Sequence, residues 1–323
     1  MKKIAIIGPI HLDGWELLKK RNFEVFEIED LSENNLIKEL KNVDGIALRT
    51  AKLTRNVMQE CPNLRIVARH GVGYDNVDLD YLNSKKLALA VTGTANAISV
   101  AEHVMTMFLC LIKQINKSDQ LTKRGDFDKK TSLPNFFELY QKNILILGFG
   151  RIGQAVAKRC LGFDSNVYVF DPFVNKEAIE DQKCHKIDFN EGIILADLIS
   201  LHMPINNETK NLIAKNQFDK MKDNCIIVNT ARGGIINEDD LLLALKNKKI
   251  LGAGLDVFVE EPPQKENPLF KLDNIILSPH NAALTLECRR RMSLETAENI
   301  AFYLDDHSKL NFQNIINRKN LNL

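Results

Sequence analysis

The sequence lacks an excess of charge of either sign. It contains 43 lysine and arginine residues against 42 aspartate and glutamate residues, which gives a formal net charge of +1 at pH 7. Nucleic-acid-binding proteins carry a basic stripe, and this chain has neither such a stripe nor an acidic tail. We therefore expect no nucleic-acid partner, and a small anionic substrate has to be bound by locally placed groups.

Patterns for metal binding and for disulfides are also missing. The six cysteines are scattered along the chain and never form a C-x-x-C pair. Such spacing disfavours both a zinc site and a disulfide framework. We predict free, buried thiols in a reducing cytosol and no bound metal.

Long hydrophobic runs are absent as well. The N-terminal apolar run, residues 4–7, ends at Gly8 and Pro9 and is too short for the core of a signal peptide. The most apolar helical stretch, residues 104–112, has about half of the roughly 20 residues that cross a membrane. These features predict a soluble, cytoplasmic protein that does not bind membranes.

The chain does show short β-branched runs that alternate with amphipathic stretches, over a length sufficient for two domains. This alternation is typical of parallel α/β folds. The first series of expected strands covers residues 3–8, 23–29, 45–50, 64–71 and 87–93. The second series covers residues 143–148, 166–171, 196–202, 225–230, 250–258 and 274–280.

Two long helical patterns lie at the ends of the second series. Residues 96–115 and 287–306 have apolar side chains at helical spacing, and we expect the polar stretch 116–136 to be a loop. Two such helices can carry the chain into an inserted domain and back out. We predict an outer, discontinuous domain of residues 1–97 and 284–323, with residues 98–283 inserted as a second domain.

The stretch "GFGRIG" fits a dinucleotide-binding turn, because an apolar strand precedes it and a helical pattern follows. Gly148 permits the tight turn, Gly150 lets the backbone approach a pyrophosphate, and Gly153 lets the helix pack close to the sheet. The pyrophosphate would lie on the free N–H groups at the helix start. An ordinary α/β turn is the alternative, since glycine-rich turns are common.

Asp171 ends the next expected strand and completes the dinucleotide pattern. Its carboxylate can accept hydrogen bonds from an adenosine ribose and would repel a 2′-phosphate, and no arginine follows it. These features favour NAD over NADP as the cofactor, although Asp171 can also be an acid that simply ends a strand. We predict an α/β protein in which a Rossmann-type NAD-binding domain is inserted into a flavodoxin-like substrate-binding domain.

Three charged or titratable side chains follow strands of the second series, at the sheet edge where open parallel sheets bind ligands. Arg232 can pair with a carboxylate and polarise a carbonyl, and His280 can move a proton at neutral pH. Glu261 beside the imidazole would orient the ring and stabilise its cationic form. Each residue taken alone has another explanation: Arg232 as a surface arginine at a helix start, Glu261 as part of a solvated acidic turn, and His280 as a capped loop histidine. Their joint placement behind a dinucleotide turn favours catalysis.

Several motifs resemble one enzyme family. "GFGRIG", "NTARGG", "GLDVFVEEPP" and "SPHNAALT", in this order, resemble the D-isomer-specific 2-hydroxyacid dehydrogenases. "RTAKLT", "ARHGVGYDNVD" and "SVAEH" are similar to the D-3-phosphoglycerate dehydrogenase branch. The resemblance implies NAD-dependent interconversion of a small D-2-hydroxy acid and its 2-oxo acid, of the phosphoglycerate dehydrogenase or hydroxypyruvate/glyoxylate reductase type.

The resemblance also implies residue roles. Arg232 would bind and polarise the 2-oxo acid, His280 would be the general acid/base, and Glu261 would be the partner of His280. Asp256 would hold the nicotinamide carboxamide. The other expected cofactor contacts are Arg151, Ile152, Met203, Pro204, Thr230 and Ala231.

Substrate contacts are expected from the outer domain. The glycines of "HGVGYDN" permit backbone N–H groups to converge on an anion, and the resemblance assigns Val72 and Gly73 to the substrate carboxylate. Arg49 and Arg69 match positions that face a phosphorylated substrate, although both can instead be surface cations. His103, in the first long helical pattern, is expected to be a cleft or core histidine and no catalytic base.

Other functions remain open. Formate dehydrogenase shares this broad fold but pairs its histidine with glutamine, so Glu261 argues against it. An NAD-sensing binding protein or a corepressor-like relative without turnover is the alternative from another class. The end of the chain at Leu323 leads us to expect no C-terminal regulatory domain. The apolar helical patterns lead us to expect a homodimer.

Overall fold

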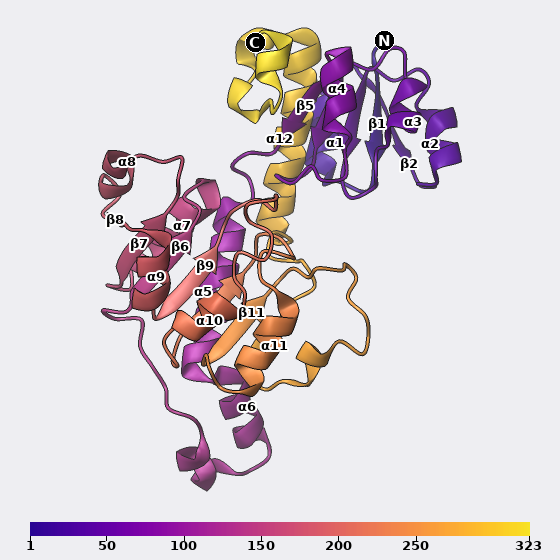
Figure 1. The fold of residues 1–323 in the computed structure, drawn as a ribbon. Helices are drawn as coiled ribbons and strands as arrows, with labels where there is room; N and C mark the ends of the chain where they lie inside the picture. The colour runs from indigo at the N-terminus through magenta and orange to yellow at the C-terminus, as the bar shows by residue number, and fades with distance from the viewer. The chain divides into compact units, whose positions relative to one another are not determined.

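The protein is described from a computed structural model that covers all 323 residues. The chain divides into two compact units (Figure 1). The first unit comprises Met1–Asn96 and Leu284–Leu323, and the second comprises Ala97–Ala283. Each unit is a parallel sheet covered by helices on both faces, so the predicted α/β class is confirmed.

The first unit is built on a five-stranded sheet in the order β2-β1-β3-β4-β5, which is the flavodoxin-like order. Its strands are β1 (Lys3–Ile7), β2 (Glu24–Ile28), β3 (Gly45–Leu48), β4 (Ile66–Arg69) and β5 (Ala88–Val91). Its helices are α1 (Leu12–Lys20), α2 (Glu33–Glu39), α3 (Arg55–Gln59), α4 (Leu79–Lys85) and α12 (Leu286–Asp305), followed by the 3-10 helices η3 (His307–Lys309), η4 (Phe312–Asn314) and η5 (Arg318–Leu321).

Two apolar clusters cover the two faces of this sheet. In β1, Ile4 and Ile6 join α1 and α12 on one face, and Ala5 and Ile7 join α2, α3 and α4 on the other. Near-continuous apolar strands are expected when helices cover both faces of a parallel sheet. The C-terminal helix α12 therefore completes the core begun by the first 96 residues, and it packs beside α1 (Figure 1).

The second unit has a seven-stranded parallel sheet in the order β12-β11-β10-β9-β6-β7-β8. This is the Rossmann order extended by one strand, with its switch point between β6 and β9. Its strands are β6 (Asn143–Leu147), β7 (Asn166–Phe170), β8 (His185–Lys186), β9 (Leu198–Leu201), β10 (Ile226–Asn229), β11 (Gly252–Leu255) and β12 (Ile275–Leu277). Its helices are α5 (Ala97–Lys113), α6 (Ile115–Lys123), η1 (Phe127–Ser132), α7 (Arg151–Leu161), α8 (Lys176–Glu180), α9 (Phe189–Leu195), α10 (Lys215–Lys220), α11 (Glu238–Lys246) and η2 (Pro268–Lys271).

The faces of this sheet are covered in the same way. One apolar cluster joins the sheet to α5, α7 and α8, and the other joins it to α9, α10 and α11. In β6, Ile144 and Ile146 face the first cluster, and Leu145 and Leu147 face the second. The residues of the predicted site lie in the loops that follow the carboxyl ends of these strands.

Two local expectations were wrong. Residues 116–136 were expected to be a loop, but they contain η1 and all of α6 except its first residue, Ile115. The only apolar residues of α6 are Ile115 and Leu121 and none of its residues is buried, so the helix lacks the apolar stripe on which helix prediction depends. The two-residue strand β8 was also missed, because two exposed residues carry no strand pattern.

No single helix has the length and apolar composition to cross a membrane. The pair α5 and α6, bent by 58°, meets those limits only when taken together, by length and composition alone.

Candidate active site

The site residues predicted in the second unit lie in loops, or in the first turn of α7, at one edge of its sheet. This is the carboxyl edge, because every one of these residues follows the last residue of a parallel strand. The loops after β6, β7, β9, β10, β11 and β12 carry Gly148, Asp171, Met203, Arg232, Glu261 and His280, respectively. Ligands of open α/β sheets bind at this edge.

The glycine turn after β6 needs its glycines for two different reasons. Gly148 has a φ of 95°, and a Cβ atom on it would lie 2.6 Å from the backbone oxygen of His202. A Cβ atom on Gly153 would lie 2.1 Å from the oxygen of Gly148, so this glycine permits the close approach of α7 to the turn.

The same turn has an open side that fits a dinucleotide. A Cβ atom on Gly150 would meet no other atom within 4 Å. Gly150 is also the N-cap of α7, and no side chain caps the helix there. The N–H groups of the first helical turn, at Arg151 and Ile152, therefore remain available for a pyrophosphate.

Asp171 ties the glycine turn to the loop after β7. One carboxylate oxygen accepts a hydrogen bond from the N–H of Phe149 at 2.8 Å. The other accepts hydrogen bonds from the N–H groups of Phe173 at 2.8 Å and Val174 at 3.2 Å. The carboxylate thus places a negative charge beside the turn and also holds its shape, which sequence reasoning did not anticipate.

The Arg232 loop is held by Asn229, the buried last residue of β10. The Asn229 side chain donates to the backbone oxygen of Arg232 at 2.8 Å and accepts from the N–H of Ala231 at 3.0 Å. The Arg232 guanidinium donates to the oxygen of Ala231 at 2.7 Å. The Asn229 amide therefore sets the direction in which the loop leaves the sheet.

Gly233 brings the Arg232 loop against the loop after β11. A Cβ atom at position 233 would lie 1.8 Å from the backbone oxygen of Phe258 and 2.6 Å from the nitrogen of Val259. Any side chain would therefore separate the two loops. The paired glycines of "ARGG" indicate that another chain segment can come close, but only the tertiary structure shows that this segment is the backbone of Phe258 and Val259.

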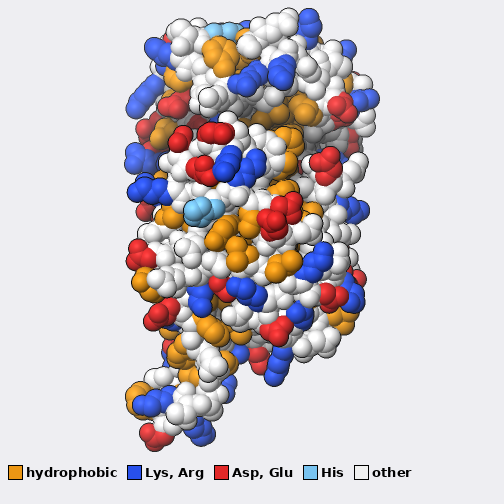
Figure 2. Space-filling view, turned by 60° about the vertical axis from the view of Figure 1, so that its left-hand side comes forward, with side chains coloured by type: hydrophobic (Ala, Val, Ile, Leu, Met, Phe, Trp, Pro, Cys, Tyr) orange, Lys and Arg blue, Asp and Glu red, His pale blue; other side chains and the backbone are white.

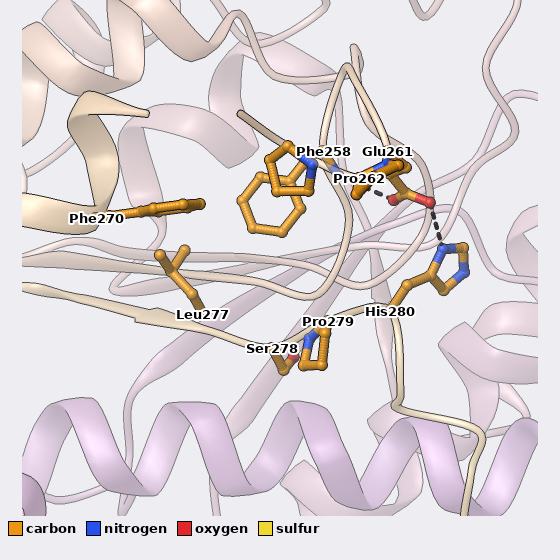
Figure 3. A pocket seen from close by; sticks show the side chains of 9 residues that line it. Phe258, Glu261, Pro262, Phe270, Leu277, Ser278, Pro279 and His280 are labelled. Atoms are coloured by element: carbon orange, nitrogen blue, oxygen red, sulfur yellow. Dashed lines mark hydrogen bonds and ion pairs between the residues drawn. The ribbon is translucent and has the colours of Figure 1, made fainter. Parts of the chain in front are cut away.

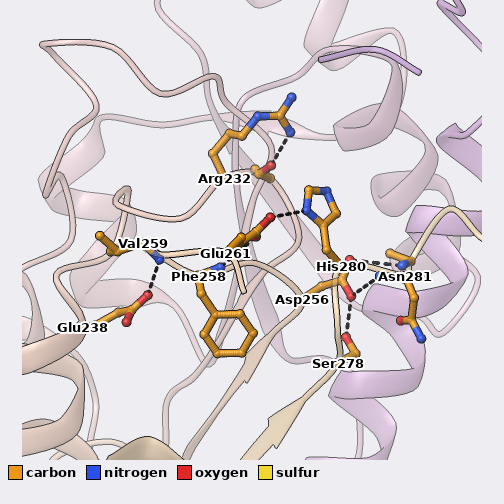
Figure 4. A network of polar contacts seen from close by, with 11 residues as sticks. Arg232, Glu238, Asp256, Phe258, Val259, Glu261, Ser278, His280 and Asn281 are labelled. Carbon is orange, nitrogen blue, oxygen red and sulfur yellow. Dashed lines mark hydrogen bonds and ion pairs between the residues drawn. The ribbon is translucent and has the colours of Figure 1, made fainter. Parts of the chain in front are cut away.

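Glu261 and His280 form a hydrogen-bonded pair (Figure 4). His280 Nδ1 lies 2.7 Å from Glu261 Oε2, while Glu261 Oε1 accepts the N–H of Phe258 at 3.0 Å. Because Nδ1 is engaged, Nε2 is the ring atom that is left for a substrate. The glutamate is therefore oriented at both oxygens, and it orients the imidazole in turn.

The carboxylate of Asp256 holds the turn that carries His280 through hydrogen bonds. Asp256 is buried, with only 1% of its surface exposed. Asp256 Oδ1 accepts the hydroxyl of Ser278 at 2.5 Å and the N–H of Asn281 at 2.9 Å, and Oδ2 accepts the N–H of Ala282 at 3.1 Å (Figure 4). The resemblance assigned Asp256 to the nicotinamide carboxamide. Within the structure its hydrogen bonds go to the His280 turn.

An apolar pocket of about 440 Å³ lies beside the Glu261–His280 pair. Figure 3 shows Phe270 and Leu277 at one end of the pocket and the pair at the other. Phe258 and Phe270 meet edge to face at 6.2 Å between ring centroids. The pair itself lies at the open side of the pocket, because the His280 side chain is 52% exposed and the Glu261 side chain 36% exposed.

A second acid, Glu238, supports the Glu261 loop and was missed from the sequence. It begins α11, and its carboxylate accepts the N–H of Val259 at 2.7 Å (Figure 4). Burial raises the pKa of Glu238, and the nearby acids Asp239 and Glu261 add to this shift. A carboxylate at a helix start gives no sequence signal for a contact with a distant loop.

The predicted substrate residues of the first unit lie at the carboxyl edge of its sheet: Arg49 follows β3, Arg69 is the last residue of β4, and Val72 and Gly73 lie in the loop after β4. Arg69 donates to the side chain of Asn76 at 3.2 Å and to the oxygen of His70 at 2.7 Å, so part of its guanidinium braces its own loop. Arg49 makes one long contact, 3.5 Å, with the oxygen of Pro9. Val72, between the two glycines of this loop, is 36% exposed.

His70 lies in the same loop and is buried, with 7% of its surface exposed. Burial, together with the guanidinium groups of Arg49 and Arg69, lowers its pKa to about 4. The folded protein therefore holds this imidazole neutral near two cations. No group of three or more His, Cys, Asp or Glu side chains in the chain is arranged to hold a metal ion.

Comparison with known proteins links the second unit to one family. Residues 105–282 match the model described as "D-isomer specific 2-hydroxyacid dehydrogenase, NAD binding domain".

Similar curated proteins extend this likeness over the whole chain. A D-3-phosphoglycerate dehydrogenase of Methanocaldococcus jannaschii is 38% identical over 99% of this chain and 60% of its own length. A hydroxypyruvate reductase of Thermotoga maritima is 35% identical over 92% of this chain and 97% of its own length. The chain spans 56–60% of the length of the archaeal phosphoglycerate dehydrogenases that it matches.

Among solved structures, a D-lactate dehydrogenase of Aquifex aeolicus, in complex with NAD and lactic acid, is 28% identical with a TM-score of 0.85. The match covers 97% of this chain and 98% of that one.

The buried, neutral His70 predicts a pH-dependent stability. The unfolded chain binds this proton near the ordinary pKa of 6.5, whereas the folded protein does so only near 4. The contribution of neutral His70 to the free energy of unfolding is therefore fully present above pH 6.5. It is lost as the pH falls toward 4, by up to about 3 kcal/mol. Urea unfolding at pH 7.5 and 4.5 should show a smaller pH dependence for His70→Asn than for the wild type. The exposed His307→Asn is the control, and an equal pH dependence in all three proteins would contradict this reading.

Proposed function

Because the chain belongs to the D-isomer specific 2-hydroxyacid dehydrogenase family, we propose that it interconverts a small D-2-hydroxy acid and its 2-oxo acid. The observation that carries the proposal is the Glu261–His280 pair, 2.7 Å apart, at the same sheet edge as the glycine turn. A proton carrier and a hydride carrier at one edge are the two parts that this reaction requires.

In the proposed mechanism the nicotinamide, when bound, supplies or accepts the hydride. His280 donates a proton from Nε2 to the oxo group in the reductive direction and takes it back in the oxidative one. Glu261 accepts from Nδ1 and stabilises the imidazolium form of the ring. Arg232 binds the substrate carboxylate and polarises the adjacent carbonyl.

We propose NAD, and not NADP, as the cofactor. Gly148, Gly150, Gly153, Arg151 and Ile152 would hold the pyrophosphate at the start of α7, as the uncapped N–H groups there support. The Asp171 charge would accept the ribose hydroxyls and repel a 2′-phosphate. Met203, Pro204, Thr230 and Ala231 would line the rest of the groove, with Asp256 near the nicotinamide end.

Residues of the first unit are proposed to select the substrate. Val72 and Gly73 would offer backbone N–H groups to the substrate carboxylate, because Gly71 takes a φ of 145° and turns the loop at its start. Arg49 and Arg69 would face a phosphate or another anionic group. The proposed substrates are therefore of the phosphoglycerate, hydroxypyruvate or glyoxylate type.

We further propose a homodimer. The segment of α6, η1 and the residues that follow η1 carries exposed apolar side chains at Ile115 (49% exposed), Phe127 (63%) and Phe136 (51%). Figure 2 shows hydrophobic and charged side chains mixed on the part of the chain that protrudes at the bottom of the view. A second copy would cover these side chains, and a mass near 36.7 kDa by light scattering would contradict this.

The reaction is tested by steady-state kinetics with NADH and 3-phosphohydroxypyruvate, hydroxypyruvate, glyoxylate and pyruvate. The wild type should turn over at least one of them, and His280→Ala should lower kcat by about 10²–10⁴-fold while NADH affinity stays within about twofold. His185→Ala, an exposed histidine of the same unit, is the matched control. NADH binding without turnover of any 2-oxo acid would favour the sensor alternative and remove the enzyme proposal.

The cofactor assignment is tested by Asp171→Asn, which removes the charge and keeps one oxygen, able to accept either from the N–H of Phe149 or from those of Phe173 and Val174. We expect the ratio of kcat/KM for NADPH over NADH to rise by about 10–100-fold, equivalent to roughly 1.4–2.8 kcal/mol. Asp181→Asn, on an exposed residue after α8, should leave this ratio unchanged. A wild type that prefers NADPH would show that Asp171 does not select the cofactor.

A further inference from the structure

Ser278 sits between two side chains that sequence reasoning did not connect. Its hydroxyl oxygen lies 2.5 Å from Asp256 Oδ1 and 2.9 Å from His103 Nε2. His103 belongs to α5, far from Ser278 in the sequence, and both lie in the second unit. The three side chains form a row, and its middle member, Ser278, belongs to the turn after β12 that carries His280.

The hydrogens in this row can be assigned by counting donors. A serine hydroxyl has one hydrogen, and an ionised carboxylate can only accept. In the 2.5 Å contact the Ser278 hydroxyl therefore donates its hydrogen to Asp256 Oδ1. The Ser278 oxygen can then only accept from His103, so His103 Nε2 must carry a hydrogen.

The turn that contains Ser278 and His280 needs this support. His280 has a φ of 51°, a left-handed conformation that costs a side-chain-bearing residue about 1 kcal/mol or more. Asp256 holds the turn from both sides, through Ser278 before His280 and through Asn281 and Ala282 after it. Only the Ser278 contact depends on a hydroxyl that can rotate away.

We propose that His103 is a positioning residue of the acid–base site. It donates its Nε2 hydrogen to Ser278, which aims the Ser278 hydroxyl at Asp256 and fixes the turn that presents His280. His103 Nε2 also lies 3.8 Å from Asp256 Oδ1, so the imidazole is close to the carboxylate as well as to Ser278. The His103 side chain is 24% exposed, which distinguishes it from a core histidine. The kinetic part of the proposal rests on the proposed function.

The tautomer is tested without turnover. ¹⁵N-labelled histidine gives signals for only seven rings, and His103→Gln identifies one of them by its loss. We expect neutral His103 to carry its hydrogen on Nε2, and Ser278→Ala to shift that nitrogen. A neutral ring with its hydrogen on Nδ1 would overturn the proposal even if the enzyme is active.

The coupling to His280 is tested by a double-mutant cycle. His103→Leu should lower kcat about tenfold or more, with KM and NADH affinity within about twofold. His103→Gln, whose amide can replace the Nε2 donor, should recover most of kcat. Both residues act through one contact. The kcat of the double variant His103→Leu/Ser278→Ala should therefore be no lower than that of the single variant with the lower kcat.

The controls separate the possible failures. Thr106→Ala, on the exposed face of α5, should leave kcat unchanged. If His103→Leu does not fold, His103→Gln and Ser278→Ala complete the test. Losses that multiply in the double variant, or a His103→Leu enzyme with wild-type kcat, would overturn the proposal. A wild type without turnover would remove the proposed function, and the tautomer measurement would still decide the contact.

Discussion

The geometry of the candidate site depends on one buried carboxylate. Asp256 accepts three hydrogen bonds from the turn after β12 while it sits at the end of β11 with 1% exposure. Neighbouring strands of a sheet fix their backbones but leave the following loops free. Asp256 restricts the turn after β12, in which His280 has a left-handed backbone conformation. An unpaired carboxylate at this depth would cost several kcal/mol, so the turn and the carboxylate stabilise each other.

The same principle recurs around the sheet edge. Asn229 holds the Arg232 loop, Asp171 holds the glycine turn, and Glu238 holds the loop that carries Glu261. In each case a polar side chain near a strand or helix end satisfies backbone groups of a functional loop. Gly233 adds a steric condition, because it lets two of these loops touch. These contacts restrict the conformations of the loops, and the proposed proton and hydride transfer needs side chains held in fixed positions.

The sequence allowed the fold to be predicted because its signals are local and repeated. Apolar strands that face two helical layers, and the glycine turn after β6, are visible without tertiary information. The Glu261–His280 contact could be expected from resemblance, and the structure brings the two side chains together at 2.7 Å. The Asp256 clamp, the Gly233 approach and the His103–Ser278 contact could not be predicted, because each joins residues from different loops or elements. The helix α6 was missed because none of its residues is buried.

The central proposal is that three loops of one sheet edge present Arg232 for substrate binding, and Glu261 and His280 for proton transfer, at a single site. The most direct test is a crystal structure of the protein with NADH and oxamate, a 2-oxo acid analogue. We predict that His280 Nε2 and the Arg232 guanidinium both lie within about 3.2 Å of oxygens of the analogue. An analogue bound beside the nicotinamide with neither side chain in contact would contradict the account.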